Sequence, residues 1–121
     1  EERRTAAERI IAAVRAHPFM VAGTERFCTD LMSAVPGAFV KTGAEGVFCA
    51  AVPHVGLGIA LKCDDGASRA AQALTARLLI DLAVFGDDDC KILEGFACAP
   101  IANRADIEVG ELRAVGEHHS A

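Results

Sequence analysis

A lysine followed by small residues lies between two apolar segments near the middle of the chain. The stretch is Lys41-Thr42-Gly43-Ala44-Glu45-Gly46-Val47. The flanking segments are apolar enough to be interior strands, which puts Lys41 at a strand end, at the boundary with solvent. Because glycine has no Cβ, Gly43 lets a ligand or another segment approach the backbone closely. The stretch therefore suits an anion or carbonyl site. The alternative is a solvated hairpin turn with a surface lysine.

The hydrophobic pattern predicts an α+β fold in which helices pack on an antiparallel sheet. Three apolar segments separated by turns are typical of a meander of three strands. A further alternating segment predicts a C-terminal strand that can return to the sheet edge, with Gly110 as a candidate bulge. Predicted helices span residues 5–16, 25–35 (capped by Thr24), 67–85 and 90–94; predicted strands span 38–40, 47–52, 55–62 and 107–115, and 100–104 is a predicted loop.

The pattern also predicts what covers two of these elements. In the third strand, bulky residues alternate with small or polar ones: Leu57, Ile59 and Leu61 against Gly58, Ala60 and Lys62. We expect a helix or another backbone close over the small face. The helix over 67–85 is apolar on most sides, with a central stripe formed by Ala71, Leu74, Leu78 and Leu82. We expect it to be buried by the sheet and by protein outside this chain, or in a dimer.

The composition describes one globular domain. The 121 residues are 52% hydrophobic and 24% charged, enough for one core and too few for two domains. We expect a single domain over 1–115 and a polar tail over 116–121. The formal charge of -5, with Lys and Arg spread along the chain, argues against a nucleic-acid partner. No stretch is long and apolar enough to cross a bilayer, so no membrane partner is expected.

The cysteines indicate a reducing compartment. The five of them are odd in number, lie mostly in apolar surroundings and show no paired metal-ligand spacing. This pattern favours reduced, packed thiols over a disulfide framework. No apolar signal core follows Glu1, so we expect a cytoplasmic protein.

Several stretches together resemble one family. They are residues 20–32, 41–47, 56–62, 65–70 and 103–113. In this order they resemble the C-terminal half of the asparaginase II family of rhizobial type. The resemblance implies a fold similar to part of the serine β-lactamases and serine-dependent glutaminases. It also implies hydrolysis of L-asparagine to L-aspartate and ammonia, through a serine in a Ser-x-x-Lys motif that faces a Lys-Thr-Gly-like strand across the cleft.

The resemblance assigns roles to the opening stretch. Lys41 would be the catalytic lysine that faces the nucleophile and stabilises negative charge as the tetrahedral intermediate forms. Thr42 would donate a hydroxyl to the substrate, and Gly43 would permit its close approach. Glu45, on the same turn, is placed among the substrate-binding residues.

Two further residues are candidates for substrate binding. Arg26, at a predicted helix start, could hold a substrate carboxylate or form an internal ion pair. Cys28 falls where other family members can carry an aspartate, and the alternative is a packed core cysteine. We expect no metal ligand and no cofactor in this chain.

One departure from the family pattern limits the assignment. No Ser-x-x-Lys occurs in the 121 residues. We therefore expect a C-terminal portion, inactive alone, with the nucleophile and the zinc-binding cysteines and lysine of some members lying upstream. The expected partners are L-asparagine or a related small amide, and either a second copy or the missing N-terminal half. Two alternatives remain: a non-catalytic domain that binds a small amide or carboxylate, and a structural half that completes a dimer.

Overall fold

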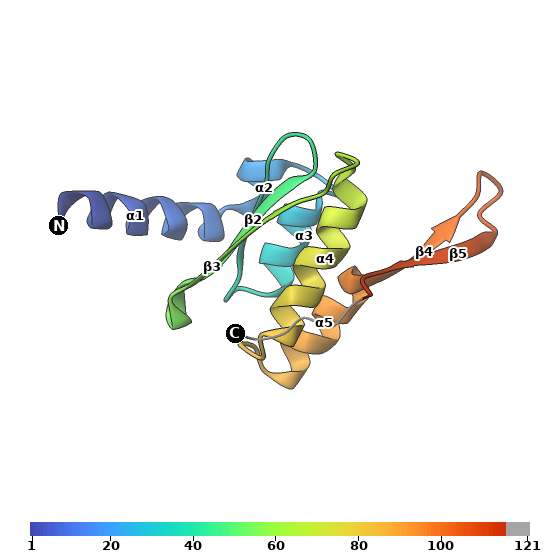
Figure 1. Ribbon diagram of the computed structural model, residues 1–121. Coiled ribbons are helices and arrows are strands. Elements are labelled where there is room, and N and C mark those ends of the chain that lie inside the picture. Colours follow the sequence, from blue (N-terminus) through green and yellow to red (C-terminus); the bar gives the residue numbers. More distant parts are fainter. Residues whose placement is uncertain (116–121) are drawn as a thin grey trace.

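The computed structural model describes residues 1–115, which form a layered α+β domain (Figure 1). Its elements are α1 (Glu2–Ala16), α2 (Pro18–Ala22), α3 (Phe27–Ala34), β1 (Phe39–Thr42), β2 (Val47–Val52), η1 (Pro53–Val55), β3 (Leu57–Lys62), α4 (Ser68–Asp81), α5 (Asp87–Ala97), β4 (Cys98–Ala102) and β5 (Glu108–Arg113). The α+β class is confirmed. The tail expected at 116–121 lies outside the described residues. Within residues 1–115, no helix is long and apolar enough to cross a membrane.

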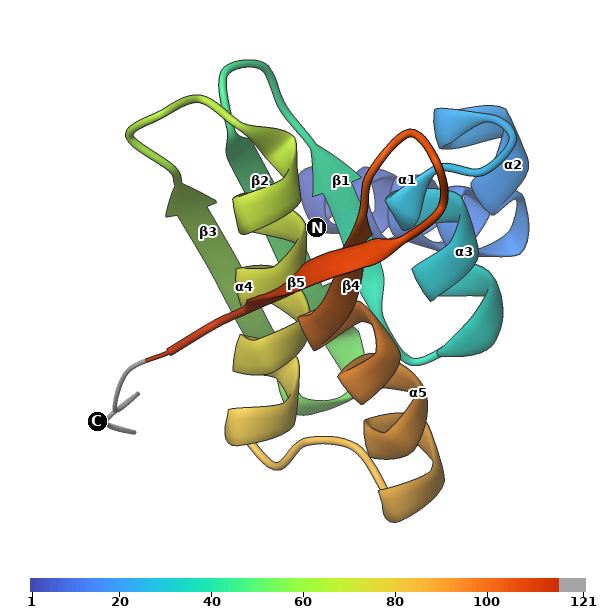
Figure 2. The same cartoon turned by 90° about the vertical axis from the view of Figure 1, so that its right-hand side faces the viewer.

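The predicted meander is confirmed. Strands β1, β2 and β3 form a three-stranded antiparallel sheet in chain order. The register pairs Val40 with Ala50 and Ala50 with Ile59, which brings the buried side chains of these strands onto one face. Figure 2 shows α4 lying across this face, with α5 and the β4–β5 hairpin beyond α4. The sheet is thus covered on one side by successive layers.

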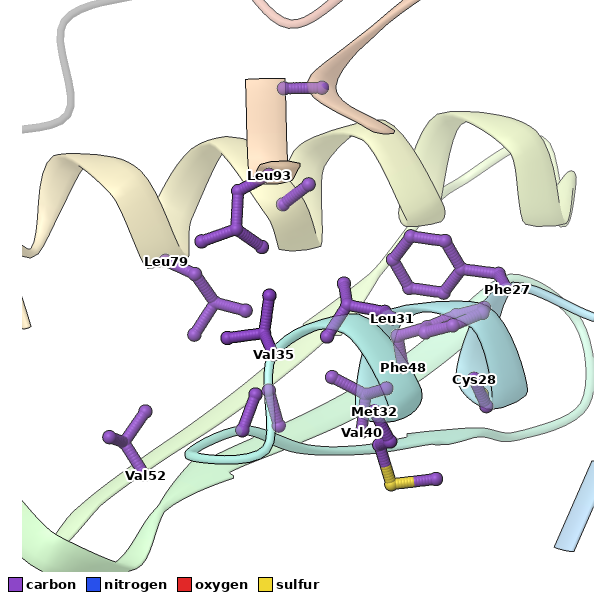
Figure 3. Packing of buried hydrophobic residues seen from close by; sticks show 14 of the residues in the cluster. Phe27, Cys28, Leu31, Met32, Val35, Val40, Phe48, Val52, Leu79 and Leu93 are labelled. Carbon is purple, nitrogen blue, oxygen red and sulfur yellow. The ribbon is translucent and has the colours of Figure 1, made fainter. Parts of the chain in front are cut away.

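The core lies between this sheet face and helices α3, α4 and α5. Leu31, Leu79 and Leu93, one from each helix, are fully buried there (Figure 3). The Phe27 ring meets the Phe48 ring edge-on, with centroids 5.6 Å apart. It also meets the Phe96 ring edge-on at 5.5 Å, so the first residue of α3 packs against both the sheet and α5.

The expected cover on β3 is wrong. Leu57, Ile59 and Leu61 are the residues that pack against the core, whereas Gly58 and Ala60 are exposed. An added Cβ at Gly58 would meet no atom within 4 Å. Burying leucine and isoleucine removes far more apolar area from water than burying glycine or alanine, so α4 packs on the bulky face.

The opposite face of the sheet, which we call the open face, is formed by Phe39, Lys41, Val47, Cys49, Ala51, Gly58, Ala60 and Lys62. Helix α1 lies on this side and contacts β1. Figures 1 and 2 show α1 running away from the sheet on this side. The open face is therefore bare along most of its length.

The C-terminal strand does not return to the sheet edge. Strand β5 pairs with β4 in a separate two-stranded sheet, and β4 includes part of the predicted loop at 100–104. The Asn103 side chain closes this hairpin by accepting backbone N–H bonds from Ala105 (2.8 Å) and Ile107 (3.1 Å). Closing so short a loop costs less chain entropy than a return to the distant sheet. The predicted irregularity occurs at the pair Ile101 and Gly110, next to a register shift.

The predicted bounds of three helices and one predicted stripe are wrong. Helix α3 begins at Phe27 instead of near Thr24, because Glu25 adopts φ 53°. Helix α4 ends at Asp81, since Ala83 adopts φ 51°, and α5 extends well beyond 90–94. The buried face of α4 is formed by Ala71, Ala73, Thr75, Ala76 and Leu79. Small residues therefore form most of this face, which allows α4 to lie close to its neighbours.

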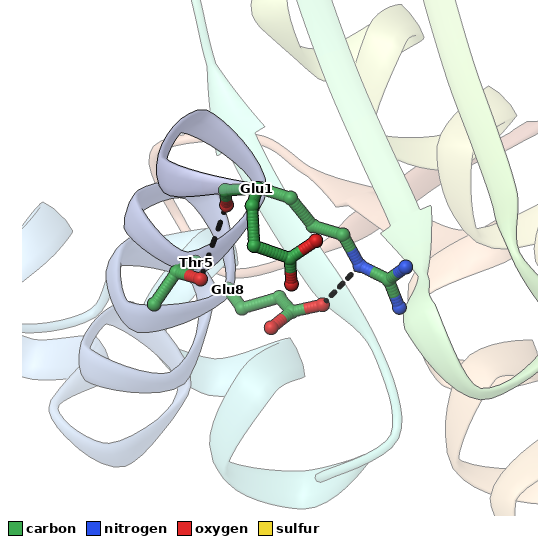
Figure 4. Close-up of polar contacts among 4 residues, drawn as sticks. Glu1, Thr5 and Glu8 are labelled. Carbon is green, nitrogen blue, oxygen red and sulfur yellow. Dashed lines mark hydrogen bonds and ion pairs between the residues drawn. The ribbon is translucent and has the colours of Figure 1, made fainter.

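Helix α1 has no buried residue, although Val14 touches the core. Ile10 of this helix is 63% exposed. Its local contacts are an Arg4–Glu8 ion pair at 2.9 Å and a Thr5 hydroxyl that donates to the Glu1 carbonyl (Figure 4). Such exposed pairs stabilise a helix only slightly. Its C-terminal end is held by the Arg15 guanidinium, which donates to the Pro36 carbonyl.

The turn between β1 and β2 is held by a close contact between two backbones. Gly46 has φ 71°, and a Cβ there would lie 2.9 Å from the Gly66 carbonyl carbon. The Cys63 N–H donates to the Gly46 carbonyl at 3.0 Å. The contact ties this turn to the one that leads into α4.

Replacing Leu31 by alanine should destabilise the domain. The side chain is fully buried, so the loss in unfolding free energy should be about 2–5 kcal/mol. Urea unfolding followed by circular dichroism measures it. The exposed Ile10→Ala is the matched control and should change stability by less than about 0.5 kcal/mol. Equal effects of the two substitutions would contradict the described core.

Replacing Gly46 by alanine should cost about 1–3 kcal/mol, because the new Cβ meets the Gly66 backbone at a positive φ. The control is Gly58→Ala, where the Cβ meets open space and stability should be unchanged or rise slightly. Thermal melting of both variants compares them. A Gly46→Ala protein as stable as the wild type would show that the two turns are not in contact.

Candidate functional site

Lys41 lies on the open face, one residue before the end of β1. Its side chain is exposed, and its ammonium donates to the Thr42 carbonyl at 2.5 Å. Directly opposite on β2 lies Cys49, which is also exposed. The predicted position of a cation at a strand end is confirmed, and the cation faces the side of the sheet that α4 leaves free.

Thr42 points to the other face and lines a small pocket. Arg26 and Cys28, at the start of α3, line the same pocket, and Ser68 and Gln72, at the start of α4, close it from the opposite side. Its volume is about 20 Å³, which is room for one water-sized group. The pocket therefore admits the polar end of a small ligand and not a whole amino acid.

The Cys28 thiol belongs to both the core and this pocket. It is 1% exposed, and burial raises its pKa above the ordinary value. A hydrogen bond from the Thr42 backbone and the positive charges of Lys41 and Arg26 oppose this rise. Burial dominates, so the thiol is neutral at pH 7. The structure thus brings Arg26, Cys28, Lys41 and Thr42 together.

Gly43 and Glu45 lie apart from that pocket. The Gly43 N–H donates to the Val47 carbonyl at 2.7 Å, and a Cβ on Gly43 would lie 3.0 Å from the Val47 Cβ. Glu45 is exposed at the tip of the turn, with φ 55°. The segment that approaches the turn closely is the chain's own Gly66, which contacts Gly46. Substrate-binding roles for Gly43 and Glu45 stay predictions.

Arg26 occupies the N-cap position of α3 and is exposed. Across residues 1–115 its guanidinium forms no ion pair or hydrogen bond, although its backbone carbonyl accepts from the Asp30 N–H. The structure therefore does not contain the internal ion pair that was the alternative to carboxylate binding. The guanidinium remains available at the mouth of the pocket.

Sequence reasoning missed Ser68 and Gln72. Ser68 is the first residue of α4, whose N-cap is Ala67. The Ala67 N–H donates to the Asp65 carboxylate at 2.9 Å. The available signal was the spacing: residues 68 and 72 are four apart and so share one face of the helix.

Within residues 1–115, no group of three or more His, Cys, Asp or Glu side chains could hold a metal ion. The zinc that the resemblance attributes to upstream residues in some members therefore has no ligand cluster in this part of the chain.

Comparison with known proteins completes the description of the site. A search of curated proteins returns no match for this chain. The family model for L-asparaginase II matches residues 1–114. The match spans both turns, the strand that carries Lys41 and every pocket residue named above. This protein therefore belongs to the L-asparaginase II family.

Proposed function

We propose that this chain supplies the Lys-Thr-Gly wall of a cleft that hydrolyses L-asparagine to L-aspartate and ammonia. Family membership supports an asparaginase-like function in general. The observation that carries the finer proposal is the placement of Lys41. It lies on the open face and acts electrostatically on Cys28, a residue of the polar pocket.

In this proposal Lys41 acts as a fixed positive charge. Attack on the side-chain carbonyl of asparagine places negative charge on its oxygen, and a nearby ammonium stabilises that charge. The same ammonium favours the deprotonated form of a neighbouring nucleophile or base. Thr42 and Arg26 would position the substrate, the first through its hydroxyl and the second through its cation.

The nucleophile would come from a segment outside these 121 residues, because they contain no Ser-x-x-Lys. That segment would lie over the end of β1, where Lys41 and Thr42 are adjacent, so that its nucleophile reaches both the ammonium and the mouth of the pocket. The neighbouring open face includes the small residues Ala51, Gly58 and Ala60, and α1 runs away from the sheet on the same side (Figure 1) with Ile10 exposed. A helix of this length is only marginally stable without packing. The corner between α1 and the open face would accommodate such a segment.

A second candidate function is the binding of a small amide or carboxylate without catalysis. The observation that favours it is that residues of the described part of the chain line the pocket and that the Arg26 guanidinium has no ion-pair partner within residues 1–115. Calorimetry on the 121-residue chain with L-asparagine, L-aspartate and L-glutamine separates the two functions. Tight binding by the chain alone would favour the binding domain.

Lys41→Ala in the enzyme that contains this chain should lower kcat by about 10²–10³-fold, the loss typical of removing one transition-state charge contact. Ammonia release from L-asparagine measures it. Lys62→Ala is the matched control. Lys62 lies on the same open face, and its ammonium donates to the carbonyl of the following residue, Cys63, as that of Lys41 does to Thr42. This variant should keep nearly full activity. Unchanged ammonia release in Lys41→Ala would remove the catalytic role, and the 121-residue chain alone should release none.

A further inference from the structure

We infer that Gln72, with Ser68, binds the side-chain carboxamide of the ligand and distinguishes the amide from the corresponding acid. The inference rests on the proposed function and adds two binding residues to it. Both residues lie in the first two turns of α4 and face the pocket that Arg26, Cys28 and Thr42 line from the opposite side.

The size of the pocket limits what can enter it. About 20 Å³ holds one group the size of a water molecule, such as an amide nitrogen or a carbonyl oxygen. Only the tip of an asparagine side chain meets this limit, while its α-carboxylate and α-ammonium stay at the mouth. Arg26, exposed and without an ion pair within the described chain, is placed to meet the α-carboxylate there.

The polar groups of Gln72 and Ser68 are available. Within residues 1–115 neither side chain forms a hydrogen bond, whereas the nearby Thr75 hydroxyl donates to the Ala71 carbonyl at 2.7 Å. Gln72 is partly buried, so its amide has already lost part of its contact with water. A partly desolvated amide without a protein partner gains more from a ligand hydrogen bond than an exposed one.

The chemistry of glutamine selects for an amide. Its side chain offers both an N–H donor and a carbonyl acceptor, and a carboxamide offers the same pair. An amide nitrogen that enters the pocket can therefore donate to the Gln72 carbonyl. A carboxylate has only acceptors, so with L-aspartate the Gln72 carbonyl would face a negative oxygen. Arg26 binds a group that substrate and product share, and so contributes affinity without discrimination.

The test measures binding of L-asparagine and L-aspartate by calorimetry. It uses the enzyme that contains this chain, in a Lys41→Ala background that prevents hydrolysis during the titration. Gln72→Leu should raise the Kd of L-asparagine about tenfold, the effect of losing one or two net hydrogen bonds, and change that of L-aspartate by less than about threefold. Gln72→Glu should weaken L-aspartate more than L-asparagine, because the new charge repels the carboxylate.

Arg69→Ala is the matched control, since Arg69 is exposed on the same turn of α4 and does not line the small pocket. It should leave both Kd values unchanged. If Gln72→Leu lowers the melting temperature of the protein, Gln72→Asn and Ser68→Ala provide a second test of the inference. Gln72→Asn withdraws the amide by one methylene, and each of these two variants should raise the Kd of L-asparagine severalfold.

The outcomes separate this inference from the proposed function. An unchanged Kd ratio of the two amino acids in the Gln72 variants, or no binding of either one by the parent protein, would overturn the inference. Full turnover in Lys41→Ala would overturn the catalytic proposal. In that case the Km of the Gln72 variants for L-asparagine would still test the inference. A changed ratio in a protein without ammonia release would support the Gln72 assignment and refute the hydrolase.

Discussion

Burial of the Phe27 ring is the interaction on which the rest of the structure depends. The ring packs edge-on against Phe48 of the sheet and Phe96 of α5, so it joins the layers on both sides of α3. Its chain neighbours are Arg26 and Cys28. The burial that holds the core together therefore also sets these two residues against Thr42. A pocket held by packing of this kind is preorganised before any ligand arrives.

A second constraint connects the Lys-Thr-Gly strand with α4. The close approach of Gly46 and Gly66 holds the turn after β1 against the turn before α4, which begins two residues later at Ser68. Because Gly46 has no Cβ, the two turns reach a separation that a Cβ at this position would prevent. The contact places Ser68 and Gln72 opposite Thr42. Two contacts thus hold the polar pocket in place: the packing of the Phe27 ring and the backbone contact between Gly46 and Gly66.

The two faces of the sheet differ in a way that matters for function. One face packs against the core, and the other carries the exposed residues Lys41, Cys49 and Lys62, with α1, which has no buried residue, beside it. A cation on a bare face has full access to an approaching ligand or chain segment. It gains catalytic strength only when that segment excludes water, because charges act more strongly at low dielectric. The arrangement explains why the proposed reaction requires a second wall.

The sequence by itself determined the α+β class, the three-stranded meander, the place of Lys41 at a strand end and the family. These properties depend on local periodicity, on turn residues and on motifs that lie within a few positions of one another. Only the tertiary structure decided which face of β3 is covered, that β5 pairs with β4, and that Ser68 and Gln72 face Thr42. A period of two residues distinguishes the faces of a strand without saying which one meets a helix. Strand pairing and pocket formation depend on contacts between segments that are distant in the sequence. Those contacts are decided by how much of each side chain can be buried.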